Sequence, residues 1–297
     1  MEFAMRRLIM PLVLLLLLVG CVHKNLPDSA QYLTPLPKSQ VQVDDVKIAY
    51  RTFGEGAPLL MIMGFAGTMD IWDAGLVREL AKEHTVIIFD NRGMSGSSNG
   101  TEQISIRRMA ADSAGLLREL GYAQADVLGW SMGGLIAQEM ALNYPEKVGK
   151  LVLLGASCDA KPVADITRKL LKMDVKELLG HFFPPGWIEK YPDAYKRLPH
   201  PASPPDPAIV QAQADAMIVW PGCCSRLREL QKATLVITGL DDDILPEPLG
   251  VEITEQVKGS WLVRYKNATH WLMYQEPVGL GRTVNNFLEV RQDLMPN

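Results

Sequence analysis

The stretch that decides the fold is Val127-Leu128-Gly129-Trp130-Ser131-Met132-Gly133-Gly134. The apolar run at 125–128 predicts a buried strand, and 132–141 predicts the helix that follows it. A serine between two glycines at such a junction indicates a nucleophile elbow. The turn demands unusual backbone angles at the serine, and the flanking glycines remove side chains that would collide with neighbouring backbone. Ser131 is therefore the predicted nucleophile, at a helix N-terminus that favours a developing oxyanion.

Strand and helix signals alternate on both sides of this stretch, which predicts an α/β fold. Residues 41–53 predict an opening hairpin with its turn at Asp44 and Asp45. Apolar runs predict further strands at 58–63, 85–90, 150–154, 233–238 and 261–265, and helices at 71–82 and 104–120.

With these motifs in this order, the chain resembles the α/β-hydrolase superfamily from about Val43 to Glu289. The resemblance implies a mostly parallel central sheet flanked by helices, with a helical cap inserted. The core would comprise residues 41–157 and 232–297, and the cap residues 158–231, where the strand–helix rhythm breaks.

Two loops of the core match the superfamily. Gly64 and Phe65 follow the third strand, where the superfamily places a His-Gly pair whose next residue donates an oxyanion amide. Met63 replaces that histidine, which affects only how the loop is braced because the donor is a backbone N–H. The resemblance assigns the oxyanion hole to the amides of Phe65 and Met132, with a plain glycine-rich turn as the alternative. The loop at 90–93 also matches, and its implied role is architectural.

The predicted base is His270, because it alone of five histidines follows the last predicted strand. Its position and surroundings match the superfamily's catalytic histidine, and it completes the order Ser…Asp…His. The other histidines lie in the N-terminal segment, at the start of a strand, or in the predicted cap: His23, His84, His181 and His200.

Three adjacent aspartates are candidates for the acid. The superfamily's loop spacing selects Asp242, three residues after Gly239 and four before Pro246. Its role would be to hold the histidine in the right tautomer and to stabilise the imidazolium. The aspartates on either side are expected to be solvated. Asp159 is the alternative, because some relatives carry the acid after the preceding strand.

The predicted cap is rich in aromatic residues. Phe182, Phe183, Trp187 and Trp220 are candidates for an apolar substrate pocket, and the alternative is that they form the cap's own core.

The four cysteines lead to two predictions, a lipidation site and a disulfide. Cys21 is the expected lipidation site, which leaves Cys158, Cys223 and Cys224 in an oxidising compartment. Cys158 opens the cap and the vicinal pair lies near its end, so we expect a bridge from Cys158 to Cys223 or Cys224. Three inert thiols are the alternative. No Cys/His cluster has zinc-site spacing, so neither a metal nor a cofactor is predicted.

The N-terminal segment predicts targeting to the bacterial cell envelope. Residues 1–20 resemble a lipoprotein signal peptide, with two arginines before an apolar run of 12 residues at 8–19. That run is short of the ~20 residues that span a bilayer. Residues 18–21 resemble a lipobox ending at Cys21, and Val22 favours outer-membrane sorting. Residues 21–40 would be the lipid anchor and tether. Ordinary secretion with cleavage nearby is the alternative.

The charge balance argues against nucleic acid as a partner. The formal net charge is −4, and removing residues 1–20 deletes one glutamate and two arginines, which gives −5. No basic patch is present in the sequence. The expected partners are a small-molecule substrate and a membrane.

The predicted activity is hydrolysis of a small carboxylic ester or lactone through an acyl-enzyme. A serine at position 131 argues against the dehalogenase and epoxide-hydrolase branches, which use aspartate there. Carbon–carbon bond hydrolysis with the same triad is one alternative. A ligand-binding receptor with a slow triad is another.

Overall fold

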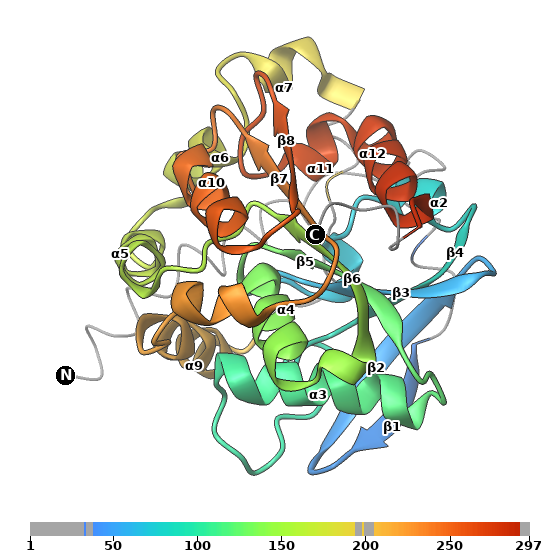
Figure 1. Ribbon diagram of the computed structural model, residues 1–297. Coiled ribbons are helices and arrows are strands. Elements are labelled where there is room, and N and C mark those ends of the chain that lie inside the picture. Colours follow the sequence, from blue (N-terminus) through green and yellow to red (C-terminus); the bar gives the residue numbers. More distant parts are fainter. Residues whose placement is uncertain (1–32, 34–37, 194–197, 199–204, 292–297) are drawn as a thin grey trace.

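One eight-stranded sheet organises the protein (Figure 1). The computed structural model describes residues 33, 38–193, 198 and 205–291. The strand order is β1-β2-β4-β3-β5-β6-β7-β8, with β1–β2 and β2–β4 antiparallel and the other neighbours parallel. The strands are β1 (Ser39–Val43), β2 (Val46–Phe53), β3 (Ala57–Ile62), β4 (His84–Phe89), β5 (Ala125–Trp130), β6 (Val148–Leu154), β7 (Thr234–Gly239) and β8 (Trp261–Tyr265). The predicted α/β class and opening hairpin are confirmed.

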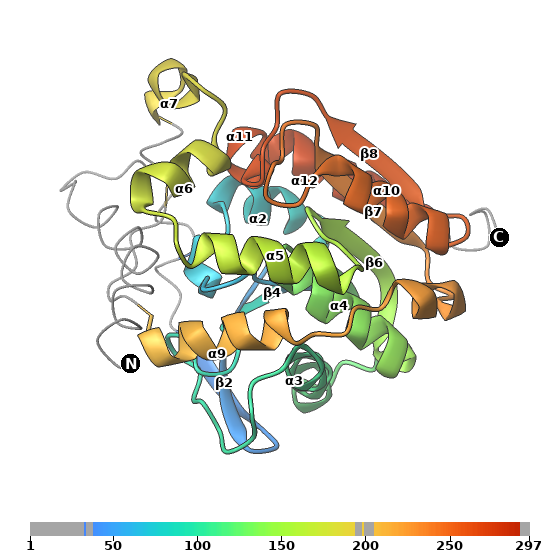
Figure 2. The same ribbon diagram turned by 90° about the vertical axis from the view of Figure 1, so that its left-hand side faces the viewer.

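Helices cover both faces of this sheet (Figures 1 and 2). Successive strand residues point to opposite faces, so Leu59 and Met61 of β3 join one core, and Leu60 and Ile62 join the other. The first core is covered by α2 (Ala74–Leu80), α11 (Leu272–Gln275) and α12 (Pro277–Glu289). The second is covered by α3 (Ile106–Glu119), α4 (Met132–Asn143) and α10 (Glu247–Gln256).

Helix α2 begins later than the expected 71–82. A 3₁₀ turn occupies Met69–Ile71, and α2 starts at Ala74. The cause is Asp73, whose carboxylate accepts the N–H groups of Gly75 and Leu76 as an N-cap. The predicted helix extends through this cap because Ile71 and Trp72, which precede it, are apolar and buried as well.

The segment 158–231 folds into helices α5 (Ala160–Leu170), α6 (Val175–Phe182), α7 (Trp187–Lys190) and α9 (Pro207–Ile218). No strand occurs in its described part, residues 158–193, 198 and 205–231. Helices α5 and α9 lie side by side (Figure 2). A 3₁₀ helix at Cys224–Glu229 leads back into β7.

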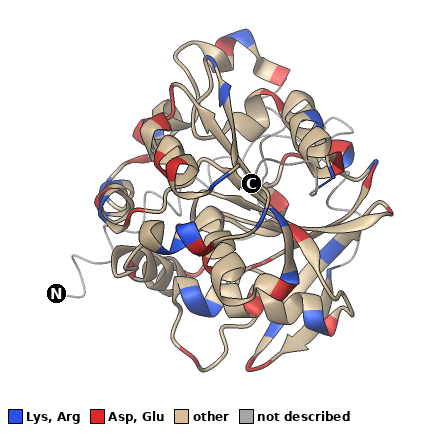
Figure 3. Ribbon diagram, viewed as in Figure 1, with Lys and Arg blue, Asp and Glu red and all other residues tan. Residues whose placement is uncertain are grey.

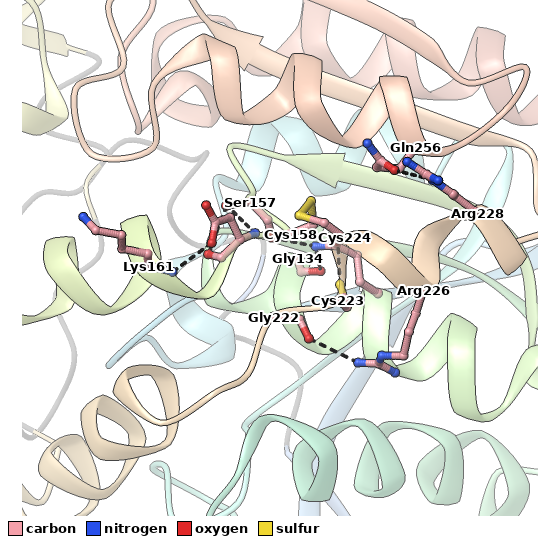
Figure 4. The surroundings of a disulfide bond; sticks show 12 residues. Gly134, Ser157, Cys158, Lys161, Gly222, Cys223, Cys224, Arg226, Arg228 and Gln256 are labelled. Atoms are coloured by element: carbon pink, nitrogen blue, oxygen red, sulfur yellow. Dashed lines mark hydrogen bonds between the residues drawn. A yellow bond between two sulfur atoms is a disulfide. The ribbon is translucent and has the colours of Figure 1, made fainter.

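A disulfide joins the two ends of this helical segment (Figure 4). It links Cys158 to Cys224, with a Cα–Cα distance of 4.8 Å, so the expected bridge is confirmed and its partner is Cys224. Cys223 is buried, and its thiol lies 3.4 Å from Gln138 Oε1. Burial raises the pKa of the Cys223 thiol to about 12, which keeps it protonated and unreactive.

The bridge also bears on metal binding. Among the described residues, Cys158, Cys224 and Glu252 are the group of potential ligands whose atoms lie close together. Both sulfurs belong to the disulfide, so neither offers a thiolate to an ion.

Removing the bridge should destabilise the protein. The Cys158→Ser/Cys224→Ser variant should lose about 2–4 kcal/mol of unfolding free energy, because the oxidised chain closes a loop spanning 66 residues in the unfolded state. Urea titrations with and without reductant would measure the loss. Cys223→Ser is the matched control and should keep the reductant-sensitive midpoint. Equal midpoints for the oxidised parent and the double variant would contradict the prediction.

Charged side chains of both signs are interspersed over the fold (Figure 3). One fully buried example is Arg92, in the loop after β4, whose Nε and Nη2 donate to Asp112 at 2.6 and 2.8 Å. Nη2 also lies 3.1 Å from Asp45 in the turn of the opening hairpin. The loop at 90–93 therefore fastens the hairpin to α3, in keeping with the architectural role expected of it.

The N-terminal predictions fall mostly outside the described residues, including the signal peptide at 1–20 and Cys21. The tether was expected to reach residue 40, but β1 begins at Ser39. Lys38 pairs with Asp70 and Asp90 at 3.0 and 3.2 Å, so the folded body begins slightly earlier than expected. Within the described ranges, no helix has the length and apolar character to cross a membrane.

Candidate active site

Ser131 occupies the turn between β5 and α4 with φ 55° and ψ −121°. Its N–H donates to the Leu154 carbonyl at 3.0 Å, which holds the strained backbone in place. Both flanking glycines are required sterically. A Cβ on Gly129 would lie 2.2 Å from the Gly133 carbonyl oxygen, and one on Gly133 would lie 2.0 Å from the Ile62 oxygen. The tight turn thus presents the hydroxyl beyond the carboxyl end of β5.

His270 lies beyond β8, with Nε2 2.9 Å from Ser131 Oγ. The Trp130 indole N–H donates to the His270 carbonyl at 3.1 Å, and the two rings lie 5.3 Å apart. Gln275 accepts the Thr269 N–H at 2.9 Å, which anchors the residue before the histidine. The imidazole is therefore positioned by the strand before the elbow and by α11.

Asp242 lies beyond β7, and its Oδ2 is 2.8 Å from His270 Nδ1. Its other oxygen accepts the N–H groups of Ile244 and Leu245 at 3.0 and 2.9 Å. The serine is 8 % exposed, and the aspartate and histidine 4 % each, so water screens these contacts little. The three residues form one continuous hydrogen-bonded chain.

Asp159, the alternative acid, has a different role. Its carboxylate accepts the Lys161 N–H at 3.0 Å and caps α5. Asp243 was expected to be only solvated, and its side chain is 59 % exposed, but its Oδ2 lies 2.7 Å from His181 Nδ1 on α6. The acid loop is thus attached to the helical segment 158–231.

The loop after β3 lies against Ser131. A Cβ on Gly64 would be 3.2 Å from Ser131 Cβ. Neither the Phe65 N–H nor the Met132 N–H donates a hydrogen bond to another described residue. The Met132 N–H is the first of α4, where the helix itself supplies no partner. Within the described part of the chain, both N–H groups are therefore unpaired.

Two side chains brace this loop where the superfamily's histidine is replaced by Met63. Asn91 Nδ2 donates to the Met63 carbonyl at 3.2 Å. Gln213 on α9 accepts the Ala66 N–H at 3.0 Å. Asp90, which directly follows β4, accepts the Met69 N–H at 2.7 Å, and burial raises the pKa of the Asp90 carboxyl. Neither Asn91 nor Gln213 was predicted, because their contacts join distant parts of the chain.

Three of the four candidate pocket aromatics meet next to the histidine. Phe182 stacks on Trp271 with ring centroids 4.4 Å apart, and Phe183 stacks on Trp187 at 4.5 Å. Phe183 also meets Trp271 edge-on at 5.6 Å. Because Trp271 directly follows His270, this cluster borders the site. In the sequence, nothing except its position next to His270 indicated that Trp271 belongs to this cluster.

The fourth aromatic, Trp220, lies elsewhere. It packs in the core on the other face of the sheet, and its indole N–H donates to Glu139 of α4 at 3.0 Å. Glu139 is also paired with Arg226. Trp220 is thus a structural anchor for the end of the helical segment, and the pocket assignment made for it is corrected.

Comparison with known proteins assigns the family. The model of the alpha/beta hydrolase fold matches residues 57–207, about half of the chain. The chain belongs to the alpha/beta hydrolase fold family. This confirms the family and fold expected from the sequence, and the protein is an α/β-hydrolase-type enzyme.

Several known proteins are similar to this chain over most of their length. A 2-hydroxy-6-oxononadienedioate/2-hydroxy-6-oxononatrienedioate hydrolase 2 of Pseudomonas putida is 26% identical, covering 82% of this chain and 92% of that protein. A 3-oxoadipate enol-lactonase 2 of Acinetobacter baylyi is 26% identical, covering 83% and 95%. An α/β-hydrolase fold protein from Chitinophaga pinensis has a TM-score of 0.77 at 26% identity, covering 86% and 98%.

Proposed function

We propose that this α/β-hydrolase cleaves a small carboxylic ester or lactone through an acyl-enzyme. Ser131 would be the nucleophile, His270 the base, and Asp242 the carboxylate that orients and stabilises the base. The observation that carries the proposal is the chain of contacts at 2.9 and 2.8 Å from Ser131 Oγ through His270 to Asp242. A serine hydroxyl is a weak nucleophile until an adjacent base takes its proton, and this arrangement supplies that base.

In the proposed reaction, His270 Nε2 takes the Oγ proton as Ser131 attacks the carbonyl carbon. The oxygen of the tetrahedral intermediate accepts the N–H groups of Phe65 and Met132. His270 then protonates the departing alkoxide, and Asp242 stabilises the imidazolium meanwhile. A water molecule deprotonated by His270 attacks the acyl-enzyme, which releases the acid and restores the serine.

The helices of residues 158–231 would serve as the cap in this proposal. Phe182, Phe183 and Trp187 are buried. Phe182 stacks on Trp271 beside His270, and Phe183 joins Trp187 to this cluster, so the three suit an apolar wall for the acyl chain. The cap is also hydrogen-bonded to the loops that carry His270 and Asp242. Thr269 Oγ1 lies 2.5 Å from the Phe182 carbonyl oxygen, and His181 pairs with Asp243.

One relative supports a second candidate function. The Pseudomonas putida protein is named for a hydroxy-oxo-dienedioate, a compound with a ketone and no ester. Its hydrolysis must break a carbon–carbon bond. The enol-lactonase relative, whose substrate is a cyclic ester, supports the ester and lactone class instead. We favour the latter because the serine, base and free amides suffice for acyl transfer without further groups.

The function is tested with aryl esters graded in acyl length, an enol lactone and a hydroxy-oxo-dienoate. We expect many turnovers on short-chain esters or the lactone, and an acyl adduct on Ser131 in quenched samples by mass spectrometry. Turnover of the dienoate alone would favour carbon–carbon hydrolysis. Stoichiometric labelling of Ser131 without turnover would favour a receptor.

We also propose that Cys21 is lipidated and anchors the protein in the bacterial outer membrane. The support is the lipobox-like stretch at 18–21 after a short apolar run. Cys21→Ser should accumulate as unprocessed precursor or leave the membrane fraction, because the lipid is the anchor. Fractionation and intact mass would measure this, with Cys223→Ser as the control. An unmodified N-terminus elsewhere in the native protein would contradict the anchor.

A further inference from the structure

Helix α9 of the cap reaches the loop that carries the proposed oxyanion amide. Its residue Ile209 packs against Gly93 in the loop after β4, where an added Cβ would lie 2.8 Å from the isoleucine side chain. Gln213 lies one helical turn further along and is fully buried. Its Oε1 accepts the Ala66 N–H at 3.0 Å, next to the amide of Phe65. A residue of the cap thus contacts the loop one position from the proposed oxyanion donor.

Within the described structure, the NH₂ group of the Gln213 carboxamide is unpaired. Because the Ala66 N–H is a donor, the carboxamide oxygen of Gln213 must face it. The NH₂ group therefore points away from Ala66. That Nε2 is buried and has no hydrogen-bond partner among the described residues. Buried polar groups are almost always paired, and an unpaired donor is costly. A residue needed only as a brace would not have to place a second, unpaired donor there.

Gln213 is not alone in this respect. The other brace, Asn91, holds Met63 with Nδ2 and leaves its buried Oδ1 without a partner in the described structure. The buried hydroxyl of Thr68 on the same loop is likewise unpaired there. Three buried polar atoms without a partner in the described structure therefore lie on or beside the loop from Met63 to Thr68. Unpaired polar atoms are expected where a polar ligand group, rather than protein, completes the hydrogen bonds.

We propose that Gln213 is a specificity-determining residue whose Nε2 donates to a second carbonyl oxygen of the substrate, on the acyl chain near the scissile carbonyl. This inference rests on the proposed ester hydrolysis and narrows its substrate class to oxo-acyl esters and lactones. A neutral carboxamide donor suits a neutral ketone oxygen. A plain alkanoyl chain would leave the donor unpaired, and sites that bury a hydrogen-bonding group discriminate against substrates that lack its partner.

The test compares matched pairs of p-nitrophenyl esters: 4-oxopentanoate with pentanoate, and 5-oxohexanoate with hexanoate. The parent should show a higher kcat/KM for at least one oxo ester, by about tenfold, the value of one hydrogen bond. Gln213→Met, similar in size but unable to donate, should bring that ratio close to one. Gln213→Glu keeps an oxygen for the Ala66 N–H and replaces the NH₂, so it should lose the preference too.

The ratio separates recognition from bracing, because a loosened loop slows both esters of a pair alike. Gln211→Met is the matched control, since Gln211 lies on the same helix but pairs with Asp215 at 2.8 Å on the surface. It should keep the parental ratio. A parent without oxo preference, or a preference that survives in both Gln213 variants, would overturn the inference. Hydrolysis by the parent of none of these esters and of no lactone, including a 3-oxo-acyl lactone, would instead overturn the proposed function.

Discussion

Replacing Ser131 with alanine should lower ester turnover by about a million-fold where chemistry limits the rate. The reason is that the nucleophile and the base act as one unit. Without Oγ there is no nucleophile, and His270 has no hydroxyl proton to take. The residual rate would come from the free amides of Phe65 and Met132 and from substrate binding. Steady-state kinetics on the best ester, with active-site titration of the parent, would measure the ratio.

The loss should be chemical rather than structural. Ser131 Oγ contacts His270 Nε2, while its backbone holds the turn through Leu154, and alanine keeps that backbone bond. Ser113→Ala is a matched control, because it removes another buried serine hydroxyl, one that donates to the Met109 carbonyl within α3. It should retain activity. A Ser131→Ala protein that hydrolyses every ester the parent accepts would defeat the enzyme mechanism.

The fold was predictable because its signals are local. Buried parallel strands are short apolar runs, and glycine marks the turns where backbone segments come closest, as at Gly129 and Gly133. The carboxyl ends of parallel strands lie at one edge of a sheet. The chain order of Ser131, Asp242 and His270, each just after a strand, therefore sufficed to predict that they meet.

Contacts between the cap and the core were not predictable in the same way. Gln213 has no local pattern to distinguish it from Gln211, two residues earlier on the same helix, and only tertiary packing places it against Ala66. Trp220 was grouped with the pocket aromatics by composition, but its indole N–H finds Glu139 on the far face of the sheet. Likewise, the choice between Cys223 and Cys224 depends on which sulfur the 3₁₀ turn presents to Cys158.

The second large effect concerns the acid. Asp242→Asn should reduce ester turnover about 10⁴-fold, because it forces the wrong tautomer on the histidine. The contacts of Asp242 determine which atom of the asparagine would face the histidine. Asp242 Oδ1 accepts two backbone N–H groups, from Ile244 and Leu245, so an asparagine oxygen would remain there. The NH₂ group would then replace Oδ2 opposite His270 Nδ1.

With an NH₂ group opposite it, Nδ1 must accept, and the proton moves to Nε2, which faces Ser131 Oγ and can no longer take its proton. Asp159→Asn is the control, because asparagine caps a helix about as well as aspartate and α5 should keep its start. Its turnover should stay close to that of the parent. Kinetics and melting curves of both variants decide the matter. A large loss in Asp159→Asn with a small one in Asp242→Asn would transfer the acid's role to Asp159, and would require a loop arrangement other than the one seen here.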